Sequence, residues 1–325
     1  MATITPAATF PVTGGMATSP AMSGTFIPTL WSGKMNAKFY ARSTFAACSN
    51  TNWEGEVSQL GDKVIIQNAP SITINDYSAG STLTYQKPTP STVELALDQG
   101  KSYSFEVNDV IAHQARPDLM EMFSTDAGEQ LKVSIDTSSW AATFDQGAAA
   151  NKGATAGVTS SSFDLGTDAA PITLTTSNIL STILAMASVL DEQNVPEEGR
   201  WLVLTPRERM LLMQSSIAQA YYTGDSTSPV RNGKIGMIDR FELYVSNLLP
   251  TGAADEDWDG GADAGTALRH AVVAGHKSAI TFANQLTKTE TLRNPSDFGD
   301  LVRGLTVYGH KVVKPEALTL LVAAG

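Results

Sequence analysis

Residues 61–107 constrain the fold most strongly, because their pattern predicts a long hairpin that projects from the body of the protein. A short apolar run at 64–66 predicts one strand, and alternation of apolar and polar residues resumes only near the end of the segment. Turn-forming residues punctuate the stretch between them: Asn68, Pro70, Gly80, Pro88 and Pro90. A projecting hairpin buries little of its own surface, so Tyr77, Leu83 and Tyr85 would be better satisfied against a neighbouring subunit.

A long helix is predicted after Pro117, because apolar side chains then recur every four residues and form one stripe. The stripe consists of Leu119, Phe123, Ala127, Leu131 and Ile135. This helix is expected to reach about Trp140. Apolar residues at helical spacing also predict shorter helices over 34–47 and 177–192.

The second half of the chain alternates helix and strand patterns. Thr205 and Glu208 are expected to form a capping box, with Pro206 at the first position of a helix that also carries Ile217 and Tyr221. Short strands are predicted at 201–204, 240–246, 268–274, 302–308 and 317–323. The sequence therefore predicts a mixed α+β fold, with no repeat of fixed period.

Three segments lack a core-forming pattern. Residues 1–25 are rich in Ala, Thr, Pro, Gly and Ser, which predicts an extended, mobile arm. Residues 145–173 are mostly Gly, Ala, Ser and Thr, which predicts a loop or linker with hinge freedom. Residues 251–266 form an acidic loop rich in Gly and Ala.

The charge is unevenly distributed over the 325 residues. Residues 1–50 hold Lys34, Lys38 and Arg42 and no acidic residue, so they carry +3 within a formal net charge of -11. An acidic body of this kind is not a general nucleic-acid binder, because phosphate binding needs a basic surface. The basic segment is either a contact for nucleic acid or an acidic partner, or a solvated helix face.

The cysteine content and the N-terminus exclude several classes of protein. Cys48 is the sole cysteine, so there is no disulfide framework or multi-cysteine metal site, and we expect a buried, inert thiol. The first ten residues lack the charged and apolar regions of a signal peptide, and no apolar run is long enough to span a bilayer. We therefore expect neither export by the usual route nor insertion into a membrane.

No residue pattern points to catalysis, a cofactor or a metal. The four histidines are isolated: His113, His270, His276 and His310. Nucleophile-elbow, phosphate-loop and dinucleotide-binding motifs are absent from the sequence. Residues 255–260 match the opening of a calcium loop, but Thr266 stands where the twelfth position requires glutamate, so we interpret the segment as a solvated acidic loop. We expect no catalytic, cofactor-binding or metal-binding residues.

The order of these elements resembles that of tailed-bacteriophage major capsid proteins of the Hong Kong 97 type. Three stretches carry the resemblance: NVPEEGRWLVLTP at 194–206, GKIGMIDRFELYVSNLLP at 233–250, and YGHKVVKPEA at 308–317. The first resembles the family's passage from helix to strand in the axial domain, and the last resembles its closing turn and strand. The similarity covers nearly the whole chain and is greatest to coat proteins of short-tailed phages, the podoviruses.

The resemblance implies a capsid fold with an N-terminal arm, an extended β-hairpin loop, a long spine helix, a peripheral domain and an axial domain. The implied parts are the arm and short helix at 1–50, the extended loop and peripheral strands at 51–107, the peripheral domain with its long helix and flexible loop at 108–173, the axial domain at 174–300, and C-terminal strands at 301–325. The compact second half would then sit at the centre of each capsomer.

The implied function is self-assembly into hexamers and pentamers of an icosahedral shell around the phage genome, without enzymatic activity. Expected partners are other copies of the chain, a scaffolding protein, the portal, packaged double-stranded DNA and a cement or decoration protein, but no membrane. The expected location is the virion shell, assembled in the cytoplasm of the host bacterium. The alternatives are another virion protein, such as a decoration or tail-tube subunit, and a binding protein or hydrolase.

Overall fold

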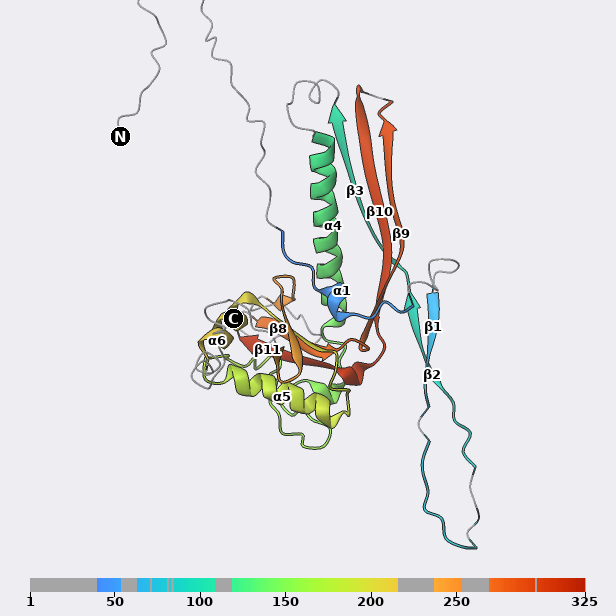
Figure 1. The fold of residues 1–325 in the computed structure, drawn as a ribbon, viewed down its shortest axis with the longest axis vertical. Helices are drawn as coiled ribbons and strands as arrows, with labels where there is room; N and C mark the ends of the chain where they lie inside the picture. The colour runs from blue at the N-terminus through green and yellow to red at the C-terminus, as the bar shows by residue number, and fades with distance from the viewer. Residues whose placement is uncertain are drawn as a thin grey trace, which may run out of the picture.

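The computed structural model describes residues 40–53, 63–70, 72–80, 82, 85–108, 119–215, 237–252, 269–295 and 297–324. Within these residues the chain forms a compact unit, an elongated unit of one long helix on a sheet, and a projecting hairpin (Figure 1). No helix among the described residues is long and apolar enough to cross a membrane. The predicted arm at 1–25, most of the acidic loop at 251–266, and the proposed start of the long helix at Pro117 lie outside the described residues.

The compact unit is built on a six-stranded sheet with the order β11-β8-β4-β6-β5, in which β7 also pairs with β8. Its strands are β4 (Arg200–Leu204), β5 (Met237–Ile238), β6 (Phe241–Val245), β7 (Thr251–Gly252), β8 (Arg269–His276) and β11 (Leu318–Ala324). Helices α5 (Ile179–Glu192) and α6 (Pro206–Gln214) accompany it. Every residue of β4 and β11 is buried, which explains their nearly continuous apolar sequences.

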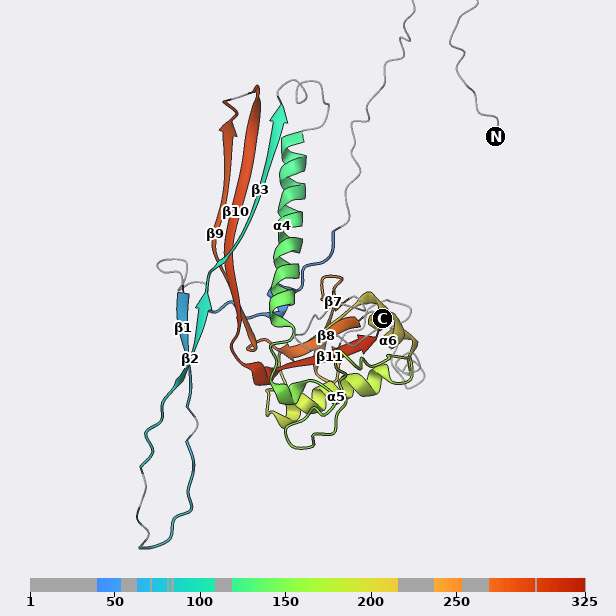
Figure 2. The same ribbon diagram turned by 180° about the vertical axis from the view of Figure 1, so that it is seen from behind.

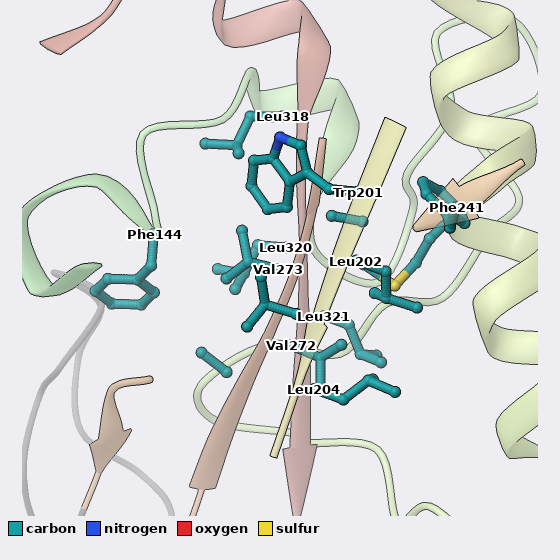
Figure 3. Close-up of a cluster of buried hydrophobic side chains, with 14 of the residues drawn as sticks. Phe144, Trp201, Leu202, Leu204, Phe241, Val272, Val273, Leu318, Leu320 and Leu321 are labelled. Atoms are coloured by element: carbon teal, nitrogen blue, oxygen red, sulfur yellow. The ribbon is translucent and has the colours of Figure 1, made fainter. Parts of the chain in front are cut away.

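The main hydrophobic core lies within this unit. Trp201 and Leu202 of β4 lie beside Val272 and Val273 of β8, with Leu320 of the neighbouring strand β11 next to them (Figure 3). Helix α5 packs on β11 and buries the apolar face that its sequence predicts. The predicted strands at 201–204, 240–246, 268–274 and 317–323 and the helix at 177–192 are therefore confirmed to within a few residues.

The elongated unit is a three-stranded antiparallel sheet with the order β3-β10-β9, covered on one face by helix α4 (Figures 1 and 2). Its strands are β3 (Gln99–Asn108), β9 (Ile280–Arg293) and β10 (Gly299–Val312), and α4 spans Leu119–Thr143. The α4 side of β10 buries Val302, Thr306 and Tyr308, whereas Leu305 on the other face is exposed. An antiparallel sheet tolerates this arrangement, because only one face needs to join the core.

The projecting hairpin is confirmed. Strands β1 (Lys63–Asn68) and β2 (Ser91–Ala96) pair antiparallel, with Lys63 opposite Ala96 and Asn68 opposite Ser91. The described residues between the two strands form no ladder and extend away from both sheets (Figure 1). The hairpin base joins the elongated unit where Gly309 of β10 lies against the backbone of Ala96.

Replacing Gly309 with valine is expected to destabilise the chain by about 1–3 kcal/mol. A Cβ atom at this position would lie 2.1 Å from the carbonyl oxygen of Ala96, and backbone atoms cannot rotate away as a side chain can. Urea unfolding of the two proteins measures the difference. The matched control is Gly100→Val, because a Cβ atom on that β3 glycine meets nothing within 4 Å; equal losses in both variants would contradict the explanation.

Several sequence predictions need correction. The short helix α1 spans only Phe45–Cys48, and residues 40–44 are not helical, so the described part of the predicted helix at 34–47 is mostly irregular chain. The capping box is absent: the side-chain oxygens of Thr205 and Glu208 make no hydrogen bond. Helix α6 ends at Gln214, and the predicted continuation through residues 217 and 221 lies outside the described residues.

The predicted strand at 302–308 is half of a longer one, and strand β9 was not predicted at all. The proposed division of the chain at 300/301 falls inside β10, while β11 joins the sheet of the compact unit. The C-terminal residues 301–325 therefore contribute to both units.

Residues 145–173 contain only a short 3₁₀ helix, η1 (Ala149–Asn151), but they are anchored in the core rather than free. The buried Asn151 side chain donates to the carbonyl oxygens of Glu316 and Leu318 at 2.7 and 3.0 Å, and Thr319 donates to its backbone oxygen at 2.7 Å. These contacts join the segment to the start of β11, so the expectation of hinge freedom here has no support in the structure.

Candidate functional site

The polar residues singled out in the sequence do not form one site among the residues that the structure describes. His270 and His276 lie on β8 and His310 lies on β10, while His113 is outside the described residues. His276 is held by local contacts, with its Nδ1 2.8 Å from the Ser278 hydroxyl and its Nε2 2.8 Å from a backbone oxygen. Among the described residues no group of three His, Cys, Asp or Glu side chains could hold a metal ion.

Cys48 is fully buried in the core, as the sequence predicts. Burial, assisted by the nearby carboxylate of Asp136, raises the pKa of its thiol far above the usual range. A thiol in this state is protonated at neutral pH and is a poor nucleophile. The acidic segment at 255–260 lies outside the described residues.

Exposed apolar side chains instead concentrate on the hairpin. Ile72, Ile74, Tyr77 and Tyr85 are 62%, 88%, 72% and 92% exposed. Scattered apolar residues on a surface are ordinary, but four large ones on one projecting segment mark a contact surface. The hairpin therefore has the composition of an element that becomes buried only against another molecule.

A second apolar surface is a groove of about 520 Å³ between α4 and β3. Phe105 of β3 and Phe123 of α4 meet edge to face across it, with ring centroids 5.9 Å apart. Asp126 and Gln130 of α4 supply polar atoms on its lining. The Tyr40 hydroxyl donates a hydrogen bond to the Asp126 carboxylate, which raises the pKa of Tyr40 to about 12 and fixes the first described residue beside the groove.

An aromatic chain connects the elongated unit to the compact unit. Phe282 of β9 contacts Phe45 of α1, Phe45 contacts Trp140 of α4, and Trp140 contacts Trp201 of β4, with ring centroids 5.9, 5.1 and 5.7 Å apart. The buried carboxylate of Asp136 accepts hydrogen bonds from the backbone N–H groups at the start of α1. Helix α1, although one turn long, is therefore fixed against α4 and β9, next to the point where Trp140 meets Trp201 of the compact unit.

His310 lies at the sheet end of this junction, between the rings of Phe45 and Tyr308. Burial lowers the pKa of its imidazole below the ordinary 6.5; Asp98 opposes this shift and Lys311 reinforces it. The folded chain favours the neutral His310 ring. As the pH falls through 6.5, this ring is therefore protonated in the unfolded chain before it is protonated in the folded chain. The contribution of His310 to stability is therefore complete above that pH and is lost below it.

We expect the urea concentration at the midpoint of unfolding to decrease as the pH is lowered from 7.5 to 5.5. The variant His310→Gln is expected to show a smaller decrease. His276, whose pKa burial also lowers, contributes with the same sign, so His276→Gln is the comparison variant. Burial raises the pKa of Asp136, so that group contributes with the opposite sign. An unchanged pH profile in His310→Gln would show that this histidine is not the titrating group.

A comparison with protein families identifies the chain. The model of the family described as "Phage capsid protein" matches residues 91–321. The chain belongs to this phage capsid protein family. The match includes the second strand of the hairpin, helices α4, α5 and α6, and both sheets of the capsid protein except the last residues of β11. No curated protein matches the sequence.

Solved structures give the same fold. A protein of Mycobacterium phage Che8 is 27% identical, with a TM-score of 0.72, over 91% of this chain and 97% of that one. The capsid of the cyanophage P-SCSP1u is 16% identical, with a TM-score of 0.69, over 92% and 94% of the two chains. The capsid of a native GTA particle is 10% identical, with a TM-score of 0.62, over 94% and 98%.

The capsid protein is therefore a structural component that forms the shell, and its role is not enzymatic. Its function therefore depends on contact surfaces rather than on a catalytic centre. Sequence patterns identified the hairpin surface, because Tyr77 and Tyr85 stand in a segment without a core pattern. They did not identify the groove or the aromatic junction, because both join residues that are far apart in the chain.

Proposed function

We propose that this major capsid protein assembles into hexamers and pentamers of an icosahedral shell, with the hairpin of each subunit lying against a neighbouring subunit. The observation that carries the proposal is the exposure of Ile74, Tyr77 and Tyr85 on an element that forms no core of its own. In a ring of heterologous contacts, one surface of each copy meets a different surface of the next. The hairpin supplies one of these surfaces.

The parts of the fold then take the roles that the family resemblance implies. The compact unit would be the axial domain at the centre of each capsomer, α4 the spine helix, and the three-stranded sheet the peripheral domain. The hairpin would be the extended loop, and residues 1–50 would include the N-terminal arm. The aromatic junction would hold the axial and peripheral parts against each other.

The remaining expectations concern the type of phage, the place of assembly and the partners. The proposed phage is short-tailed, with the shell assembled in the cytoplasm of the host bacterium. The proposed partners are a scaffolding protein and the portal during assembly, packaged double-stranded DNA on the inner face, and a cement or decoration protein. The acidic body supports a packing role beside DNA rather than tight binding to it, because like charges repel.

Electron microscopy tests the proposal, with the full chain expressed alone and together with the other proteins of its virion. Closed shells or isolated five- and six-membered rings are the expected result. Uniform monomers or dimers under both conditions, from a chain that unfolds cooperatively, would contradict it.

A further inference from the structure

The two arms of the projecting hairpin separate where their backbone ladder ends. Asn68 and Ser91 form the last pair of the ladder. The residues that follow on the two arms include Pro70, Pro88 and Pro90, none of which has a backbone N–H to donate. An opening of about 540 Å³, lined by residues of both arms, lies at this place. Backbone pairing therefore does not hold the part of the hairpin beyond the opening.

The side chain of Gln86 joins the arms again beyond the opening. Its Nε2 donates a hydrogen bond to the Thr73 carbonyl oxygen at 3.1 Å, and its Oε1 accepts one from the Thr73 N–H at 3.0 Å. A side-chain amide has the donor and the acceptor of a peptide group, so it replaces the backbone of the opposite arm in a two-bond pair of the kind that antiparallel strands form. We call this pair the Gln86 clamp.

The clamp lies in the register of the ladder. Counting five residues inward from each member of the last ladder pair leads to Thr73 and Gln86. Counting six more leads to Ala79 and Gly80, where the structure has a turn and where the φ angle of Gly80 is +90°, as the third residue of a type II turn requires. One register therefore runs from the base of the hairpin to its tip, and the clamp maintains it beyond the prolines.

The clamp stands next to two of the most exposed apolar side chains. Ile74 directly follows Thr73, Tyr85 directly precedes Gln86, and the two apolar side chains are 88% and 92% exposed. We propose that Gln86 is a positioning residue for assembly, which holds Ile74 and Tyr85 at one level of the hairpin before a neighbouring subunit binds them. This inference rests on the proposed role of the hairpin as an assembly contact. A contact surface that is ordered in advance loses less conformational entropy on binding.

Amide hydrogen exchange of the Thr73 N–H measures the clamp in the unassembled full chain, by NMR with isotope-labelled threonine. Exchange is expected to be about tenfold slower in the unaltered chain than in Gln86→Ala, which lacks both bonds. Gln86→Glu keeps the acceptor and loses the donor, so its rate should be intermediate. The matched control is Gln67→Ala, because Gln67 is exposed on β1, where the ladder holds the arms. Equal exchange in the unaltered chain and Gln86→Ala would overturn the proposal.

The protein concentration at which shells first form, measured by light scattering and electron microscopy, tests the positioning role. Gln86→Ala is expected to raise it about tenfold, because the neighbouring subunit must then order the hairpin as it binds; Gln67→Ala should leave it unchanged. The midpoint of urea unfolding should be equal in all three proteins, which separates positioning from stability. Shells from Gln86→Ala at the unaltered concentration would refute the positioning role and leave the proposed function intact. An unaltered chain that forms no shells would contradict the proposed function and the assembly role together, and amide exchange alone would then decide the clamp.

Discussion

Replacing Tyr77 and Tyr85 together with serine is expected to abolish shell assembly while leaving the subunit folded. Both rings contact little of their own chain, since they are 72% and 92% exposed, so their loss removes no core packing. If each ring is a buried anchor worth about 2 kcal/mol in the assembled shell, the double replacement weakens every hairpin contact by roughly three orders of magnitude. A shell repeats this contact at every subunit, so the effect on assembly is large.

The measurements are thermal unfolding of the purified variant and electron microscopy under conditions in which the unaltered chain forms shells. The matched control is the double replacement of Tyr77 and Tyr85 with phenylalanine, which keeps the rings and removes only the hydroxyl groups. The control is expected to assemble. Shells formed by the serine variant at the same protein concentration would show that the hairpin is not an assembly contact.

The sequence predicted those elements whose pattern is local. Helix α4 follows from apolar residues spaced four apart, and strand β4 follows from an uninterrupted apolar run that is buried on both faces. The hairpin was predicted from the opposite pattern, because its segment has too few regularly spaced apolar residues to form a core of its own. In each case one stretch of chain contains all the information that the prediction needs.

Strand β9 escaped prediction because its environment changes along its length. Its first residues lie in the core, whereas Lys288 and Glu290 lie on an exposed face with Arg303 of β10. The register also shifts opposite Val307 and Tyr308, and such an irregularity breaks the alternation by which a strand is recognised. Its pairing with β10 therefore cannot be deduced from its own residues.

The failed capping box has a different cause. Thr205 and Glu208 have the spacing that local rules require, yet Glu208 is completely buried beside the sheet and its carboxylate makes no hydrogen bond to the helix start. Packing of α6 against β4 determines the position of that side chain. The groove and the aromatic junction were missed for the same reason, since tertiary packing rather than sequence spacing brings their members together.

Another contact between residues far apart in the chain is the buried ion pair between Asp168 and Arg269, and its loss is expected to have a large effect on stability. Asp168 belongs to the segment at 145–173, and Arg269 begins β8; both side chains are almost completely excluded from solvent. Replacing Asp168 with alanine removes this carboxylate from a buried guanidinium, and we expect a loss of about 3–5 kcal/mol in the free energy of unfolding. A loss of this size is a large part of the stability of an ordinary domain.

The double replacement Asp168→Leu with Arg269→Met separates the charge effect from packing. Apolar side chains of similar volume need no desolvation, so the double variant is expected to recover most of the stability that Asp168→Ala loses. Urea unfolding of the single and double variants provides the comparison, with Asp168→Asn as an intermediate that keeps a hydrogen-bond acceptor. If the double variant is as unstable as Asp168→Ala, then the pair acts through its specific geometry, and the segment at 145–173 depends on that contact for its place against β8 and β11.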